Sequence, residues 1–103
     1  MRMVGAQVGP EWMQLLHDWW NRHGYYPDSA AAFGQSGTVQ LHMKVNRDGT
    51  VQDLQLLDGS GSPYLDMGAL SVFRGAHLPP FLQNTPESQG DLYLTIQYVL
   101  LHR

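Results

Sequence analysis

The sequence predicts an α+β fold: a three-stranded antiparallel sheet with one main helix on one face, plus an N-terminal amphipathic helix and a short helix. Two alternating segments, residues 37–46 and 91–101, are typical of strands, and an Asp-Gly turn joins the first of them to another strand. A helical pattern before the last strand supplies a long connection that suits a crossover. The length of 103 residues suits one domain.

The first structured element is expected at residues 10–23. Residues 1–9 are small, polar and unpatterned, and we interpret them as a start codon plus a linker of a longer parent protein, outside a domain of residues 10–103. Pro10 to His23 form a predicted helix whose apolar residues fall within one arc of about 160°. These residues are Trp12, Met13, Leu15, Leu16, Trp19 and Trp20. His23 also lies in this arc and is expected to be partly buried.

A short helix and a hairpin are expected next. Pro27 and Gly34 bound one or two helical turns. In the hairpin that follows, a tip at Asp48-Gly49 places Met43 opposite Leu54, Leu41 opposite Leu56 and Lys44 opposite Asp53. The register that matches apolar residues therefore also pairs opposite charges. An Asp-Gly turn of this kind requires a positive φ at Gly49.

The last third of the chain supplies the main helix and the final strand. Ser62-Pro63 is typical of an N-cap followed by proline at the first helical position, and the helix is expected to end near His77. A proline-rich loop, pinned by Phe81, leads to the last strand. A right-handed crossover places that strand beside the first, so the predicted sheet order is second, first, last. The last strand is then a long open edge without proline or lysine, which favours pairing with a partner.

Composition excludes several functions. A net charge of −3 without a Lys/Arg cluster argues against nucleic-acid binding, and no apolar run reaches the length of a membrane span, so we expect no membrane contact by this fragment. The absence of cysteine excludes thiolate metal sites. The Gly-Ser stretch at residues 59–62 lacks the lysine of a phosphate-binding loop, and the five histidines show no metal-ligand spacing. We therefore expect no cofactor, no metal and no enzymatic activity.

A series of short motifs, in this order and spacing, resembles the C-terminal domain of the TonB family of energy transducers. The motifs are Tyr26-Pro27, Gly37–Val39, Asp48-Gly49-Val51, Ser60–Leu70, Pro79-Pro80 and the alternating strand Leu92–Leu100. The resemblance covers roughly three quarters of the chain, from Tyr25 onward. It implies that the Gly-Ser stretch is a strand-to-helix turn.

The resemblance also implies a function. Such domains lie in the periplasm of Gram-negative bacteria, and their parent proteins are anchored in the inner membrane. The domain binds a short peptide, the TonB box, of an outer-membrane TonB-dependent transporter. A motor of the ExbB–ExbD kind, acting through the N-terminal part of the parent, couples the proton gradient to uptake of siderophore, haem or cobalamin. On this reading the chain is an excised periplasmic domain.

The expected partner-binding site combines the last strand with the residues around the Tyr-Pro motif. Strand addition to the last strand would supply backbone hydrogen bonds, and side chains at one end would supply selectivity. The predicted site residues are His23, Tyr25, Tyr26, Pro27, Leu92, Tyr93, Leu94, Thr95, Ile96, Gln97, Tyr98 and Val99. Two alternatives stay open: a TonB- or TolA-like peptide-binding module of a sensor or secretion system, and an enzyme or small-ligand domain with converging His and Asp side chains.

Overall fold

A four-stranded antiparallel sheet with helices makes up the protein in the computed structural model, which describes residues 2–5, 9–83 and 85–99. No helix within these ranges is long and apolar enough to cross a bilayer. In chain order the elements are β1 (Arg2–Gly5), α1 (Pro10–His23), α2 (Asp28–Ala32), β2 (Gly37–Asn46), β3 (Val51–Asp58), α3 (Pro63–Phe73) and β4 (Gln89–Tyr98).

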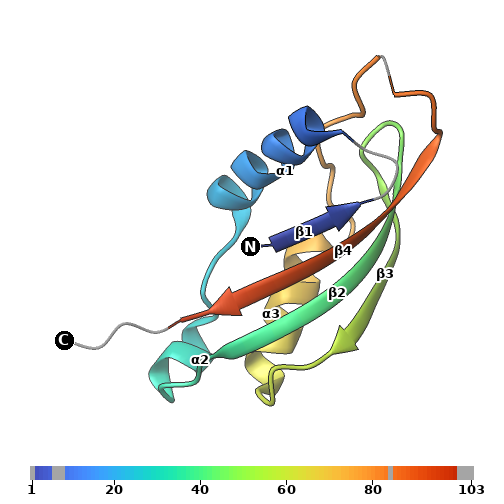
Figure 1. Ribbon diagram of the computed structural model, residues 1–103. Helices are drawn as coiled ribbons and strands as arrows, with labels where there is room; N and C mark the ends of the chain where they lie inside the picture. Colours follow the sequence, from blue (N-terminus) through green and yellow to red (C-terminus); the bar gives the residue numbers. More distant parts are fainter. Residues whose placement is uncertain (1, 6–8, 84, 100–103) are drawn as a thin grey trace.

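The predicted strands and their order are confirmed, and one more strand joins them. β3, β2 and β4 are neighbours in that order, as the crossover argument requires, and β1 lies along the outer side of β4 (Figure 1). The expectation that residues 1–9 lie outside the fold is therefore wrong for Arg2–Gly5. Their backbone pairs with Leu92–Thr95 and so covers an edge that would otherwise expose unpaired peptide groups.

The β2–β3 hairpin has the register that the sequence predicts. Met43 lies opposite Leu54, Leu41 opposite Leu56 and Lys44 opposite Asp53. At the tip, Gly49 has a φ of 92°, which confirms the expected left-handed turn residue. Its amide donates to the Asn46 carbonyl at 2.9 Å, and its carbonyl accepts from the amide of Leu78 at 2.9 Å. The hairpin tip is thus tied to the loop that follows α3.

The core lies between one face of the sheet and the helices. Alternate residues of β2 and β4 enter it: Val39, Leu41, Met43, Val45, Leu92, Leu94, Ile96 and Tyr98. α1 contributes Trp12, Leu16 and Trp19, and α3 contributes Leu65, Ala69 and Phe73. The rings of Trp19 and Trp20 stack on Phe73 with centroids 5.6 and 5.5 Å apart. Both helices therefore cover the same face of the sheet, as predicted from the apolar arc of α1.

α3 begins where the sequence predicts and ends earlier. The Ser62 hydroxyl accepts from the amide of Leu65 at 3.3 Å, which is the expected N-cap bond. The predicted end near His77 is wrong, because the helix stops at Phe73 and Gly75 adopts a φ of 68°. A left-handed residue directly after the last turn is a frequent way of ending a helix. His77 instead bridges to Thr50 at the hairpin tip.

The proline-rich loop between α3 and β4 is held by buried side chains. Leu78 and Phe81 lie in the core, so the expectation that Phe81 pins this loop is confirmed. The Trp12 indole N–H donates to the Pro79 carbonyl at 2.8 Å, and its ring meets Phe81 edge to face with centroids 5.2 Å apart. The guanidinium of Arg47 donates to the carbonyls of Leu82, Gln83, Thr85 and Glu87. One tryptophan and one arginine therefore organise most of the loop.

We expect the substitution Trp12→Ala to lower the free energy of unfolding by about 3–5 kcal/mol, because it empties a fully buried ring site and removes the bond to Pro79. Leu15→Ala is the matched control, since Leu15 lies on the same helix and is 40% exposed. The free energy of unfolding of Leu15→Ala should fall by less than about 1 kcal/mol. Denaturant unfolding measures both, and equal losses would show that α1 is peripheral to the core.

A second prediction concerns the close approach of the hairpin tip to the loop after α3. A Cβ at Gly49 would lie 2.0 Å from the Leu78 carbonyl oxygen, whereas a Cβ at Gly34, also at positive φ, would meet nothing within 4 Å. Gly34→Ala should therefore cost only backbone strain, about 1 kcal/mol. Gly49→Ala should cost at least about 1–3 kcal/mol more, because the obstacle is backbone and a clash is added to the strain. Similar melting temperatures for the two variants would contradict this assignment.

Candidate functional site

A cleft of about 380 Å³ opens between the C-terminal end of α1 and the end of β4. We call it the α1–β4 cleft. Its lining residues are Trp20, Asn21, Gly24, Tyr25, Tyr26, Ile96, Gln97, Tyr98 and Val99. The cleft thus joins the Tyr-Tyr stretch and the end of the last strand, two parts of the predicted site that lie about seventy residues apart in the sequence.

The α1 side of the cleft depends on the turn at Gly24. The Gly24 amide donates to the Trp20 carbonyl at 2.7 Å, which closes the last turn of the helix. A Cβ at Gly24 would lie 2.8 Å from both the Trp20 ring and the Trp20 carbonyl oxygen. Only glycine therefore lets the chain leave α1 beneath this indole and continue directly into Tyr25 and Tyr26.

The two tyrosines have different environments. Tyr25 is 52% exposed, and its hydroxyl lies 2.9 Å from the Ser71 hydroxyl on α3. Tyr26 is half-buried, and its hydroxyl donates to the Gln35 carbonyl. The Tyr26 ring meets Tyr98 edge to face with centroids 5.4 Å apart. Tyr26 therefore supports the β4 side of the cleft, and Tyr25 stands at its mouth.

Tyr98 is the most buried polar side chain of the cleft. It is 5% exposed, and its hydroxyl has no hydrogen-bond partner among the residues that the structure describes. Burial raises the pKa of Tyr98 to about 12, and the neighbouring Tyr25 and Tyr26 act in the same direction. The hydroxyl therefore stays protonated at neutral pH and is available as a donor.

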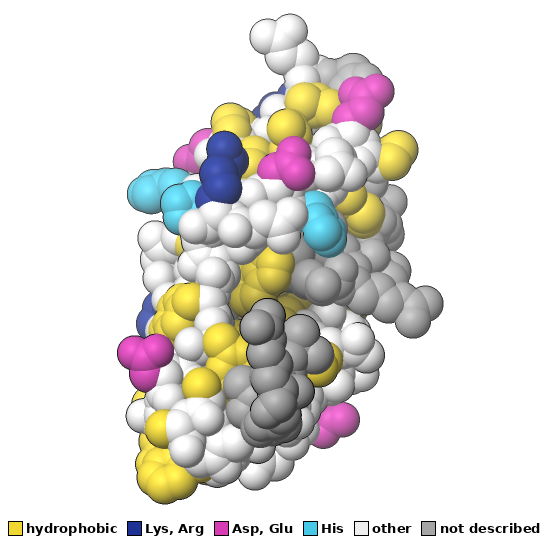
Figure 2. All heavy atoms as spheres, turned by 90° about the vertical axis from the view of Figure 1, so that its left-hand side faces the viewer, with side chains coloured by type: hydrophobic (Ala, Val, Ile, Leu, Met, Phe, Trp, Pro, Cys, Tyr) yellow, Lys and Arg dark blue, Asp and Glu magenta, His cyan; other side chains and the backbone are white. Residues whose placement is uncertain are grey.

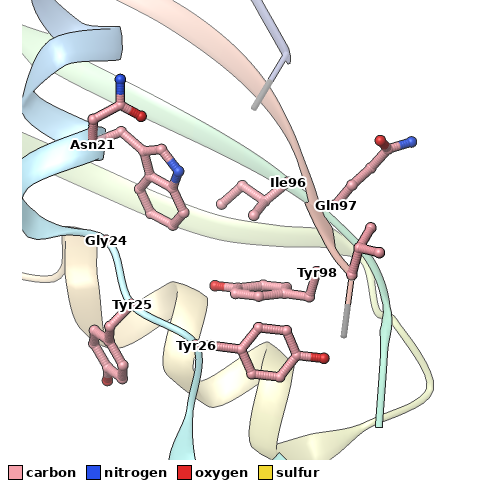
Figure 3. Close-up of a pocket in the computed structure, with 9 residues that line it drawn as sticks. Asn21, Gly24, Tyr25, Tyr26, Ile96, Gln97 and Tyr98 are labelled. Carbon is pink, nitrogen blue, oxygen red and sulfur yellow. The ribbon is translucent and has the colours of Figure 1, made fainter. Parts of the chain in front are cut away.

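The side chains of β4 alternate at the cleft. Figure 3 shows Ile96 and Tyr98 pointing toward α1 while Gln97 points away. It also shows the Tyr98 hydroxyl directed to the α1 side of the cleft, opposite to the Tyr26 hydroxyl. An extended peptide beside this part of β4 would send alternate side chains into the cleft. The cleft is thus continuous with the strand edge that the sequence assigns to a partner.

Four predicted site residues on β4 are covered. Leu92, Tyr93, Leu94 and Thr95 pair with β1, so the prediction of an open edge is wrong for this half of the strand. Leu92 and Leu94 also belong to the core. Tyr93 lies on the opposite face of the sheet, where its ring stacks on His42 with centroids 4.8 Å apart, and His42 Nε2 lies 3.0 Å from Asp91. Among the residues that the structure describes, no strand pairs with the outer edge of β4 from Ile96 onward.

Two further predicted residues stand outside the cleft. His23 is exposed, so its expected partial burial is wrong, and its ring packs on Trp19 with centroids 4.6 Å apart. Pro27 is buried against α3, because a Cβ at Gly68 would lie 2.3 Å from its ring. Pro27 therefore sets the path of the chain after Tyr26. Among the described residues, no cluster of three or more His, Asp or Glu side chains could hold a metal ion.

The face that carries the cleft is mixed in character. Figure 2 shows hydrophobic side chains at its centre, with most of the visible Lys, Arg and His side chains in the upper half. No charged residue lines the α1–β4 cleft itself among the described residues. Its lining therefore combines aromatic rings, the tyrosine hydroxyls, the neutral amides of Asn21 and Gln97, two aliphatic side chains and backbone.

Trp20, Asn21 and Gly24 were not predicted as site residues. The apolar arc of α1 includes Trp20, but periodicity alone does not distinguish a core indole from one at the rim of a cleft. A glycine directly after a helix is typical of a helix end and does not by itself indicate a site. The signal that the sequence does offer is that Tyr25 and Tyr26 follow this helix directly, which places the helix end beside the predicted site.

Comparison with known proteins now gives the family. A family model described as the Gram-negative bacterial TonB protein C-terminal matches residues 22–100. No curated protein sequence matches the chain. The chain is similar to the solution structure of Helicobacter pylori TonB-CTD residues 179–285, with 27% identity, a TM-score of 0.74, and coverage of 93% of this chain and 87% of that one.

Two other solution structures of TonB C-terminal domains are also similar to this chain. H. pylori TonB-CTD residues 194–285 has 26% identity and a TM-score of 0.65, covering 92% of this chain and 100% of that one. The Pseudomonas aeruginosa TonB CTD shares the fold, with 17% identity, a TM-score of 0.64, and coverage of 98% and 89%. Because the family model matches residues 22–100, well over half of the chain, the chain belongs to the family of Gram-negative bacterial TonB protein C-terminal domains.

Proposed function

We propose that this domain binds the TonB box of outer-membrane TonB-dependent transporters by strand addition to β4. The observation that carries the proposal is the end of β4 from Ile96 to Tyr98, which with Val99 extends beyond the described pairing with β1 and borders the α1–β4 cleft. A peptide added there gains backbone hydrogen bonds from β4 and side-chain contacts from the aromatic cleft. Family membership supports this type of partner.

The transporter-bound domain would act as a mechanical link. Within the proposal, a motor of the ExbB–ExbD kind acts through the rest of an inner-membrane-anchored parent and draws on the proton gradient. The periplasmic domain holds the transporter peptide, and siderophore, haem or cobalamin enters. The pairing of β4 with β2 over residues 37–46 and 89–98 suits this role, because a long ladder resists separation of β4 from the domain. The role is one of binding and force transfer and requires no catalysis.

β1 competes with the partner in this scheme. It pairs with Leu92–Thr95 in the register Gly5 to Leu92 and Arg2 to Thr95, on the side of β4 where the peptide would add. A short peptide can start at Ile96–Val99, but a longer added strand must displace β1. We therefore expect affinity in the micromolar range, because a flexible peptide must be ordered and an internal strand released.

Titration with a synthetic TonB-box peptide from a transporter of the same genome tests the site. We expect the backbone amide NMR signals of Ile96–Val99 and of Tyr25 and Tyr26 to shift, while β3 stays unchanged as an internal control. β3 is the appropriate comparison because it is the other outer strand of the sheet opposite β1. Shifts confined to Val51–Asp58 would place the partner at the wrong edge and contradict the proposal.

A reversible disulfide tests the competition with β1. The protein has no cysteine, and Val4 and Tyr93 are backbone partners across β1 and β4, so Val4→Cys with Tyr93→Cys places two cysteines at directly opposite positions, a spacing that a disulfide can bridge. Oxidation should weaken peptide binding roughly tenfold, because one or two backbone hydrogen bonds to Leu92–Thr95 become unavailable. Reduction of the same sample should restore it. Equal affinity in both states would show that the peptide does not displace β1.

A further inference from the structure

The Tyr98 hydroxyl suggests a selective function for the α1–β4 cleft. It is a buried donor without a protein partner among the described residues, and it is directed to the α1 side of the cleft that its ring lines. Leaving such a group unpaired costs free energy that a ligand could recover by supplying an acceptor. The hydroxyls of Tyr25 and Tyr26 do not share this property, since each contacts a protein oxygen.

Strand geometry determines which part of a bound peptide reaches this hydroxyl. Tyr98 lies on the face of β4 that points toward the helices, as Ile96 does. In a sheet, residues paired across two strands place their side chains on the same face. The peptide backbone would pair along the edge of β4, so the group that enters the cleft is a side chain of the peptide residue opposite Tyr98 or Ile96.

The cleft restricts the chemistry of that side chain. It has no charged lining residue among those described, so a carboxylate or an ammonium would be desolvated without a counter-charge. An aliphatic side chain would leave the Tyr98 hydroxyl unpaired. A seryl or threonyl hydroxyl is too short, because the Tyr98 hydroxyl sits at the far end of its ring from the strand backbone. A long neutral side chain with a terminal carbonyl satisfies every condition.

We propose that the α1–β4 cleft is a side-chain specificity site for a peptide glutamine, whose amide carbonyl accepts a hydrogen bond from the Tyr98 hydroxyl. This inference rests on the proposed strand addition and refines it. The aromatic rings of Trp20, Tyr25 and Tyr26 would enclose the aliphatic part of the side chain. A volume of about 380 Å³ accommodates one such side chain.

A peptide series with one variable position tests the specificity. The probe is the TonB-box peptide named above, carrying Gln, Leu or Glu at the residue opposite Tyr98, titrated into the intact chain and into Tyr98→Phe. We expect the wild type to prefer the Gln peptide to the Leu peptide. Tyr98→Phe should weaken the Gln peptide roughly three- to tenfold and change the Leu peptide less than twofold. The Glu peptide should bind most weakly to both proteins.

Tyr64→Phe is the matched control, because it removes an exposed phenol hydroxyl on α3 that stacks on Phe33 outside the cleft. It should leave all three affinities unchanged. The melting temperature of Tyr98→Phe should equal or exceed that of the wild type, because the lost hydroxyl has no hydrogen-bond partner among the described residues. That result separates loss of recognition from loss of folding.

The outcomes distinguish this inference from the function on which it rests. If the peptides shift the β4 amides but Tyr98→Phe weakens the Gln and Leu peptides equally, the specificity site is refuted and strand addition stands. If the Leu peptide binds the wild type as well as the Gln peptide, the inference fails in the same way. If no peptide shifts Ile96–Val99, the proposed function itself is refuted, and this inference with it.

Discussion

The stacking of two α1 indoles on Phe73 of α3 determines where the functional part of the molecule lies. Trp19 and Trp20 meet Phe73 with centroids 5.6 and 5.5 Å apart, the second pair nearly parallel at 8°. This contact fixes the end of α1 over the core, and the chain then turns at Gly24 beneath the Trp20 ring. The Tyr-Tyr stretch is thereby carried past the end of β4, and the α1–β4 cleft exists because the two meet there.

The strand edges show how the same sheet could be stable alone and open to a partner. β4 is central over Leu92–Thr95, where β1 covers it, and is uncovered by β1 from Ile96 onward. Covering an apolar strand with a short segment of the same chain limits unwanted pairing, and a short segment is also easily displaced. At this end of β4 the inward side chains of Ile96 and Tyr98 border a cleft as well as the core. One half of the strand, Leu92–Thr95, is thus protected by β1, and the end that follows is the part proposed to bind a partner.

Most of the fold was accessible from sequence because local signals and long-range pairing agreed. The alternation of residues 37–46, the Asp-Gly turn and the facing charges of Lys44 and Asp53 all specified one hairpin register, which the structure confirms. The Ser62-Pro63 pair predicted the N-cap hydrogen bond that the Ser62 hydroxyl accepts. β1 was missed because four residues without alternation carry no strand signal, and only the edge of β4 makes them a strand. The cleft was missed in part because burial of the Tyr98 hydroxyl without a partner, among the residues that the structure describes, depends on how the core packs and has no sequence motif.

The central claim is that β4 receives a transporter peptide as an added strand between Ile96 and Val99. Isotope-filtered NOE spectra of the labelled domain with an unlabelled TonB-box peptide test it most directly, because they report which backbone protons are adjacent. Our account predicts intermolecular contacts in a strand ladder with Ile96–Val99, together with contacts from peptide side chains to Tyr98 and Tyr26. Contacts to Val51–Asp58 of β3, or a bound peptide with no ladder to β4, would contradict it.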